Sequence, residues 1–403
     1  MRKLLTIISL LLLAISCSSQ NQDININQKI ERIENGLIEF KSTIGMFQPD
    51  SVQLTNPKKL TERMKFYKVP GVSIAVINGN QIEWTKAYGV SNINTGTAVT
   101  KETIFEAAST SKFLTAVLVL HFVEKGVFDL DTDVNNYLKS WHIPDNEYTK
   151  NEKVTIRRLL THKSGLPSTN FSHDNNFGYP TLINVLNGDK PALNKAAVPE
   201  FIPGQKWQYS NIGYDVIQIL VEDVLGKPFQ QIAEEIIFKP LGMINSSFNY
   251  PLDSEKIIRE AMPHDEKGIL CEPSMHLTAL AHGGLTTTPT DLAKFTNEIM
   301  LSYQGKSEIL LSQEMTKQLL NKEFDLDPNM FGMPISEGLG VFIMNEYSDL
   351  LFMHPGSNLP GLNCWLIGWP EKETAAVVMT NGANGEILAM EIISAINLVY
   401  NQD

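Results

Sequence analysis

Two residues with complementary chemistry lie three positions apart where a long apolar run begins. Ser109 and Lys112 stand just before residues 113–123, most of which are apolar. At the start of a helix, side chains at this spacing project from one face of the first turn. A lysine held against apolar neighbours loses hydration, which lowers its pKa and lets it act as a base. Such a pair can make a serine nucleophilic without a histidine.

The spacing alone does not establish a catalytic site. Ordinary serine and lysine usage gives a chain of 403 residues about one such pair by chance. A helix start with an N-terminal serine and an exposed lysine would have the same sequence. The catalytic interpretation therefore depends on further motifs.

A second segment with chemical potential is Tyr209-Ser210-Asn211, which directly precedes a helix predicted over residues 212–225. Taken alone, Tyr209 could pack beside Trp207, and Asn211 could cap the helix.

The third segment, His354-Pro355-Gly356, ends a strand predicted over residues 350–353 and leads into Ser357. By itself it offers a surface histidine at a strand end and a glycine in a turn.

Taken in order, the three segments resemble the active-site signature of the serine β-lactamase and penicillin-binding protein family, most closely its class C branch. That signature is Ser-x-x-Lys, then Tyr-x-Asn, then Lys or His-x-Gly on a strand at a sheet edge. The similarity covers roughly residues 60 to 400. Other segments that fit the family in the same order are residues 69–76, 105–109, 159–166, 240–243, 283–285 with 290–292, and 378–382.

The resemblance implies acyl-transfer chemistry without a cofactor. Ser109 Oγ would attack a carbonyl carbon to form an acyl-enzyme, and Lys112 would take or relay its proton. The Tyr209 phenol has an ordinary pKa near 10. Beside the charge of Lys112 its phenolate would be stabilised, so the two groups could share one proton. The resemblance assigns to Tyr209 the protonation of the leaving group and the activation of the hydrolytic water.

Four further residues are expected to bind substrate. Asn211 would hold a substrate amide and the Lys112 side chain. The resemblance puts the oxyanion hole at the backbone N–H groups of Ser109 and Ser357. His354 and Gly356, in the third segment, would lie along the bound substrate.

The third segment departs from the Lys-Thr-Gly of enzymes that grip β-lactams or D-alanyl peptides. Histidine is mostly neutral near pH 7, so His354 lacks the permanent charge of lysine. Pro355 has neither a hydroxyl nor an N–H group. We therefore expect weaker recognition of a substrate carboxylate. Within the family, a histidine here is similar to esterases, D-amino-acid-processing peptidases and uncharacterised hydrolases.

Three functions remain open at this point. The leading one is a serine hydrolase that cleaves an ester or amide in a small molecule or peptide, including peptides derived from the cell wall. The second is a penicillin-binding D,D-peptidase or weak β-lactamase. The third is a non-catalytic envelope binding protein, against which the intact Ser109, Lys112 and Tyr209 argue.

The elements that must position these residues indicate an α+β fold. Strands are predicted over residues 72–77, 81–87, 350–353, 363–368 and 374–380, and helices over residues 113–123, 212–225, 228–237, 290–301 and 385–400. Residues 130–330 are mostly helices and long loops. This pattern predicts one antiparallel sheet built from N- and C-terminal segments, flanked by helices, with a mostly helical insertion. We expect a single β-lactamase/transpeptidase-like hydrolase domain over residues 56–403.

The N-terminus is typical of an exported bacterial protein. Residues 4–15 are apolar and too short to span a bilayer comfortably, so residues 1–16 are predicted to be a signal peptide. Residues 13–17 resemble a lipobox, with Ala14 where leucine is commoner. Cys17 is therefore expected to carry a lipid, and residues 17–55 to form a polar tether with a short helix. A plain secretory signal with an incidental cysteine is the alternative.

Composition and residue spacing limit the kinds of partner and ligand that we expect. The formal net charge of −12, without basic stripes, argues against nucleic acid. No spacing typical of metal ligands is present. Cys271 and Cys364 remain after Cys17, and the sequence leaves open whether they pair. It also leaves open the oligomeric state, and which membrane and which face would hold the protein.

Overall fold

The structure is a computed structural model of the 403-residue chain. It describes residues 25–38, 40–43, 46–49, 57–169, 172–174, 177–249, 252–273, 278–328, 334–346 and 349–401. The predicted signal peptide and Cys17 lie outside the described residues.

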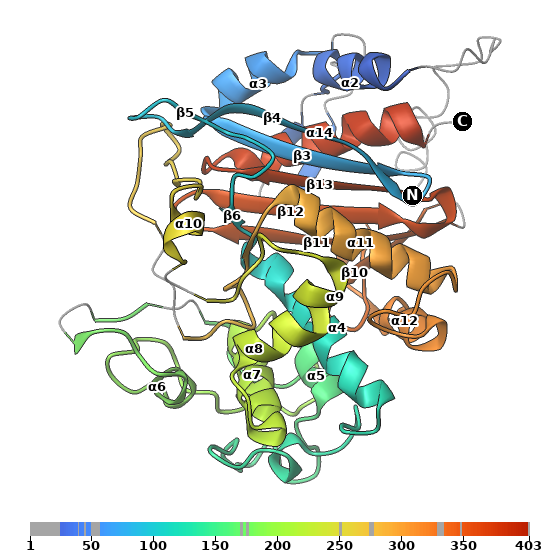
Figure 1. Cartoon of the computed structure of the whole chain (residues 1–403). Coiled ribbons are helices and arrows are strands. Elements are labelled where there is room, and N and C mark those ends of the chain that lie inside the picture. The colour runs from blue at the N-terminus through green and yellow to red at the C-terminus, as the bar shows by residue number, and fades with distance from the viewer. Residues whose placement is uncertain are drawn as a thin grey trace.

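A nine-stranded antiparallel sheet forms the centre of the protein (Figure 1). Its strands follow one another in the order β5 (Thr97–Ala98), β4 (Gln81–Asn92), β3 (Gly71–Asn78), β13 (Thr374–Thr380), β12 (Leu362–Trp369), β11 (Asp349–Asn358), β10 (Phe342–Glu346), β9 (Ser336–Glu337) and β8 (Phe324–Asp325). The early hairpin β3–β4 lies directly beside the late strand β13, where Val72 pairs with Thr380. One sheet therefore joins segments from both ends of the chain, as predicted.

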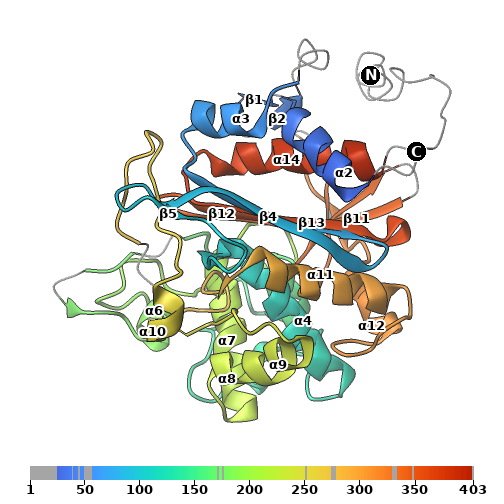
Figure 2. The ribbon, with the colours of Figure 1, turned by 45° about the horizontal axis from the view of Figure 1, so that its top comes forward.

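Helices cover both faces of this sheet (Figure 2). On one face lie α2 (Ile26–Asn35), α3 (Leu60–Tyr67) and α14 (Gly385–Tyr400), and α14 packs on β12 and β13. On the other face, α11 (Pro289–Tyr303) packs on β3, β12 and β13. Every residue of β13 is buried between these layers, which explains its continuous run of small and apolar side chains.

The α3 helix is tied to α14 by a buried ion pair. The Arg63 guanidinium donates to both carboxylate oxygens of Glu391, at 2.9 and 2.7 Å, and the Tyr67 hydroxyl donates to the same carboxylate at 2.7 Å. Both partners of the pair are almost fully buried. A bidentate arrangement with an added donor is the kind that offsets the cost of burying two charges.

Most of a largely helical region lies below α11 in Figure 1. Its helices are α4 (Ser111–Glu124), α5 (Ile156–Leu160), α6 (Leu182–Asn187), α7 (Asn211–Leu225), α8 (Phe229–Ala233), α9 (Lys239–Leu241), α10 (Ser254–Ile257) and α12 (Gln313–Leu319). Of these, α10 lies to the left of α11 in Figure 1, beside the sheet. The short strands β6 (Phe105–Glu106) and β7 (Thr286–Thr287) pair at its border with the sheet, and β1 (Phe40–Thr43) pairs with β2 (Met46–Pro49) elsewhere. Residues 111–120 of α4 are all buried, so this helix is the core of the region.

Two predicted elements differ from the structure. The helix predicted over residues 228–237 is α8 followed by a π-helical turn, Glu234–Phe238. The strand predicted to end at residue 353 continues as β11 to Asn358, because pairing with β12 extends as far as Leu362. The third motif therefore lies inside a strand and does not follow one.

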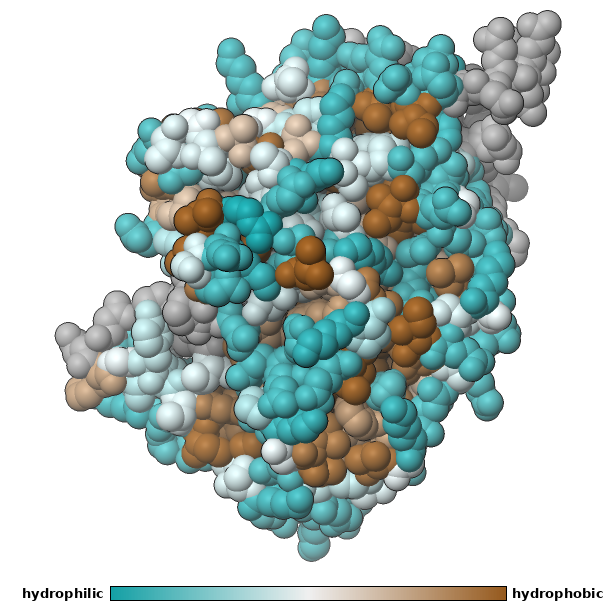
Figure 3. Space-filling model, viewed as in Figure 1, coloured by the Kyte–Doolittle hydropathy of each residue, from teal (hydrophilic) through white to brown (hydrophobic). Residues whose placement is uncertain are grey.

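The surface is that expected of a chain whose apolar residues fill the core. In the view of Figure 3, hydrophilic residues cover much of the face and hydrophobic residues occur in small scattered groups. Within the described residues, no helix has the length and apolar character needed to cross a membrane.

Candidate active site

The serine of the first motif lies in a tight turn that precedes the helix. Ser109 belongs to the 3₁₀ turn Ala108–Thr110, and α4 begins only at Ser111. This corrects the expectation that Ser109 and Lys112 share the first turn of one helix. The turn nevertheless brings them together, because Lys112 Nζ donates to Ser109 Oγ at 3.1 Å. Ala108 adopts a φ of 48°, a conformation that is rare outside glycine and is often found at functional sites.

The side chain of Lys112 is shielded from solvent. It is 0% exposed, and Nζ donates a second hydrogen bond to the His282 carbonyl oxygen at 2.7 Å. Burial lowers the pKa of Lys112 to about 7, against an opposing effect of the Asp215 carboxylate. A lysine in this state is a neutral amine for much of the time at neutral pH, which is what a general base requires.

Tyr209 is partly exposed beside this pair, and its hydroxyl forms a hydrogen bond with Ser109. Burial raises the pKa of Tyr209 far more than the hydrogen bond with Ser109 lowers it, and Glu337 raises it further, so the phenol stays protonated. The expected phenolate stabilised by Lys112 is therefore wrong. Lys112 Nζ lies 4.9 Å from the centre of the Tyr209 ring and faces the π system.

The segment around Tyr209 is held by a buried histidine. The Ser210 N–H donates to His162 Nδ1 at 3.1 Å, and the His162 ring lies 4.3 Å from the Tyr209 ring. Burial and the charge of Lys112 lower the pKa of His162 well below its ordinary value, so its nitrogen remains an acceptor. Ser210 Oγ also donates to the Pro167 carbonyl at 2.9 Å. The segment of residues 159–166 thus fixes the orientation of Tyr209.

Asn211 begins α7 at the edge of the site. Its Nδ2 makes a long hydrogen bond of 3.4 Å to the Thr169 carbonyl, and its buried Oδ1 has no partner among the described residues. The expectation that Asn211 holds the Lys112 side chain is not met, because the His282 carbonyl takes that place. An unpaired amide oxygen leaves Asn211 available to accept from a substrate.

Strand β11 packs directly against the nucleophile turn. A Cβ placed at Gly356 would lie 2.2 Å from the Ala107 carbonyl oxygen and 3.0 Å from the Ser109 nitrogen. Only glycine permits this approach. The Thr110 hydroxyl reinforces the contact by donating to the His354 carbonyl at 3.1 Å. The strand and the Ser109 N–H group are thereby brought together, as an oxyanion hole shared between them would require.

His354 and Ser357 have different environments on β11. His354 is 2% exposed, its ring lies 5.4 Å from that of Phe342, and burial and the charge of Lys112 lower its pKa to about 3. The site therefore carries no positive charge at this position. Ser357 is exposed, and its hydroxyl donates to Asn363 Oδ1 at 2.8 Å.

Several site residues have no role in the sequence prediction. Each is polar and largely buried. Four bond to a residue in or next to the three motif segments, and Asp215 bonds to His282: Glu106, His162, Asp215, His282 and Glu337. Glu106 accepts from Asn358 at 2.6 Å, and Glu337 accepts from Trp207 at 3.0 Å. Only His162 and Glu106 lie within segments that resemble the family. For the others, the signal would have been a polar residue inside an apolar pattern, as with Asp215 in α7.

Neither the two cysteines in the described part of the chain nor its acidic residues form a second candidate site. Cys271 and Cys364 are both free thiols, and burial raises the pKa of Cys364 to about 12. No group of three or more potential metal ligands occurs in the part of the chain that the structure describes.

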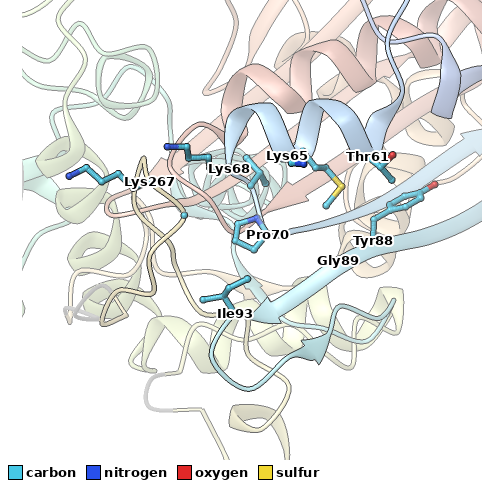
Figure 4. A pocket seen from close by; sticks show the side chains of 11 residues that line it. Thr61, Lys65, Lys68, Pro70, Tyr88, Gly89, Ile93 and Lys267 are labelled. Atoms are coloured by element: carbon cyan, nitrogen blue, oxygen red, sulfur yellow. The ribbon is translucent and has the colours of Figure 1, made fainter.

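A surface cavity of about 470 Å³ lies away from the nucleophile, between α3, β4 and the loop at Lys267 (Figure 4). Pro70 and Ile93 contribute to its apolar lining, and Lys65 and Lys68 lie at its rim. Three strands, β13, β12 and β3, separate β4 from the β11 strand of the catalytic residues. The cavity is therefore distinct from the candidate active site.

Comparison with known proteins agrees with this geometry. The family model described as Beta-lactamase matches residues 57–397, so the chain belongs to the beta-lactamase family. Protein flp of Staphylococcus aureus (strain N315) is 23% identical over 319 residues, which are 78% of this chain and 60% of that protein. The chain thus spans only 60% of the length of this relative.

Solved structures share the fold. The octameric penicillin-binding protein homologue from Pyrococcus abyssi has a TM-score of 0.70 at 25% identity, over 84% of this chain and 75% of that chain. The D-alanine carboxypeptidase AmpC from Burkholderia cenocepacia has a TM-score of 0.64 at 20% identity, over 83% and 96%. The predicted β-lactamase/transpeptidase-like fold is therefore confirmed.

The close approach of β11 predicts that Gly356→Ala disrupts the site. The added methyl group must displace the turn at Ser109, and a shift of that kind lowers kcat/KM by at least about 100-fold. The matched control is Gly213→Ala in α7, where the nearest atom to the new Cβ is 3.5 Å away, an ordinary van der Waals contact. For this control, kcat/KM measured by steady-state kinetics on an ester that the wild type hydrolyses should stay within about threefold of the wild-type value. Equal activity of the two variants would contradict the steric argument.

Proposed function

We propose that the protein is a serine hydrolase that cleaves an ester or amide bond through an acyl-Ser109 intermediate. The observation that supports this most directly is the hydrogen bond from Lys112 Nζ to Ser109 Oγ, together with the lowered pKa of Lys112. A buried, partly neutral lysine beside a serine hydroxyl has the properties of a base and not of a structural cation.

The proposed reaction proceeds in two halves. Neutral Lys112 takes the proton from the Ser109 hydroxyl as Oγ bonds to the substrate carbonyl carbon, and the oxyanion is bound by the backbone N–H groups of Ser109 and Ser357. The tetrahedral intermediate collapses when the leaving group departs with a proton that passes from Lys112 through the Tyr209 hydroxyl. Water then attacks the acyl carbon and gives a proton through the Tyr209 hydroxyl to Lys112. Lys112 passes this proton to Ser109 Oγ as the acyl bond breaks, which restores the serine hydroxyl.

The residues of the third segment favour a substrate whose binding does not depend on recognition of a carboxylate. The neutral His354 and the proline at 355 provide neither a cation nor a hydroxyl. We therefore propose esters, amides and D-amino peptides that present no carboxylate at this position as substrates, in preference to β-lactams. The penicillin-binding homologue and the D-alanine carboxypeptidase among the similar structures keep a D,D-peptidase or weak β-lactamase as the second candidate.

The proposal predicts that Ser109 is the single site of covalent labelling by a serine-reactive fluorophosphonate. Intact mass spectrometry should show one adduct on the wild type and none on Ser109→Ala. An adduct that persists on Ser109→Ala, or no adduct on the wild type, would contradict the catalytic proposal and favour a binding protein. Penicillin in place of the phosphonate separates the two candidates, since fast labelling with slow release supports the D,D-peptidase.

The lowered pKa of Lys112 predicts the pH dependence of the reaction. Only the deprotonated amine accepts the Ser109 proton, so kcat/KM on an uncharged ester should rise as pH increases through about 7. Well below this value the rate should fall about tenfold for each pH unit, because the neutral fraction falls by that factor. A rate that is flat between pH 5.5 and 8.5 would show that Lys112 is not the base.

We propose in addition that the protein is exported and anchored in the bacterial envelope through a lipid on Cys17. The support is the sequence of residues 1–17, which lie outside the described residues. Cys17→Ser should move the protein from the membrane fraction to the soluble fraction, as followed by fractionation and immunoblotting. Retention of Cys17→Ser in the membrane fraction would contradict a lipid tether.

A further inference from the structure

Behind Lys112 lies a carboxylate–imidazole pair that the proposed reaction does not use. His282 Nδ1 is 2.8 Å from Asp215 Oδ1. Asp215 comes from the second turn of α7 and is 0% exposed, whereas His282 belongs to the loop that precedes β7. The pair therefore connects the helix that follows Tyr209 to the loop over the nucleophile.

The backbone of the same histidine touches the base. Lys112 Nζ donates to the His282 carbonyl oxygen at 2.7 Å and to Ser109 Oγ at 3.1 Å. These two acceptors fix the direction of the amine, and the shorter bond is to His282. A small movement of the His282 peptide would therefore turn Nζ away from the serine.

The environment of Asp215 is unusual for a structural carboxylate. Its Oδ2 is buried and has no hydrogen-bond partner among the described residues. A buried carboxylate oxygen without a donor is costly, so a side chain that served only to fasten the loop would be better as an amide. The retained charge lies close enough to Lys112 to favour its protonated form.

We propose that Asp215 and His282 form a positioning pair for Lys112, in which the Asp215 carboxylate fixes the His282 imidazole and thereby the carbonyl oxygen that holds Lys112 Nζ against Ser109. The inference rests on the proposed role of Lys112 as the base. The negative charge of Asp215 has a second effect, since it keeps the amine basic enough to take a serine proton in spite of its burial.

Other groups also face Lys112 and must be considered in any pH experiment. They come from α7 and its preceding segment, from the 159–166 segment and from β11: Tyr209, Tyr214, His162 and His354. Burial keeps all four neutral near pH 7, since it raises the pKa of each tyrosine and lowers that of each histidine. Asp215 is thus the charged group whose removal should be visible in the titration of Lys112.

The test measures Lys112 directly, by NMR titration of full-length protein labelled with ¹³C at the lysine Cε, with the signal assigned from Lys112→Met. Asp215→Asn should lower the pKa of Lys112 by about one unit, because the negative charge that favours the ammonium is gone. In parallel, the fluorophosphonate labelling rate at pH 9 should fall about tenfold in His282→Leu and recover to within about threefold of wild type in His282→Asn, whose amide can replace Nδ1–H.

The matched control is Gln218→Met. Gln218 lies one turn further along α7 and holds the same loop through the Leu280 N–H at 2.7 Å and the Thr278 carbonyl at 3.0 Å, but it carries no charge. It should leave the pKa of Lys112 within about 0.2 units of wild type. An unchanged Lys112 pKa in folded Asp215→Asn would contradict the proposed positioning pair. A change of the Lys112 pKa in Gln218→Met as large as that in Asp215→Asn would contradict it as well. Failure of the phosphonate to label the wild type would instead refute the proposed function, while the NMR titration still decides the role of Asp215.

Discussion

The burial of one amine governs the rest of this structure. Lys112 lies at the start of a helix whose first ten residues are all buried, so its charge is shielded from solvent. The chain meets this cost with a serine hydroxyl, a backbone carbonyl and the distant field of a carboxylate, and it places no ion pair against the amine. A direct ion pair would have kept the lysine protonated and inert as a base.

The scaffold holds this amine by enclosing it between two parts of the chain that are far apart in sequence. The nucleophile turn is pressed against β11, where Gly356 allows backbone to approach backbone. On the other side, α7 and the loop at His282 close over Lys112. Because β11 belongs to a sheet joined by both ends of the chain, the geometry of the site depends on the completed fold and not on any local element.

Burial also sets the electrostatic character of the site. His162 and His354 have lowered pKa values and Tyr209 has a raised one, so these three groups stay neutral near pH 7. Burial also raises the pKa of Glu337. The two histidines therefore bring no positive charge to the site. A buried environment of this kind strengthens the hydrogen bonds that would stabilise an oxyanion, and it agrees with the proposed preference for a substrate without a carboxylate.

The sequence by itself determined the class of fold and the order of the main elements, and it located the three motif segments from which the proposed active site is built. Periodicity located the hairpin β3–β4, the strand β13 and the helices α7 and α14, because each has a continuous apolar pattern of its own. Motif order then identified Ser109, Lys112 and Tyr209. These features are local, or they recur in the family with a fixed order, so they can be recognised without coordinates.

The tertiary structure alone decided which residues surround the base. Asp215 and His282 are 67 positions apart, and no spacing rule connects them. It also showed that burial keeps the Tyr209 phenol protonated and that His354 is buried and neutral. Desolvation and distance fix a pKa, and both arise only when segments remote in the chain pack together. The sequence therefore predicted which residues would be the nucleophile and its base, and the packing around them sets the protonation states on which the proposed reaction depends.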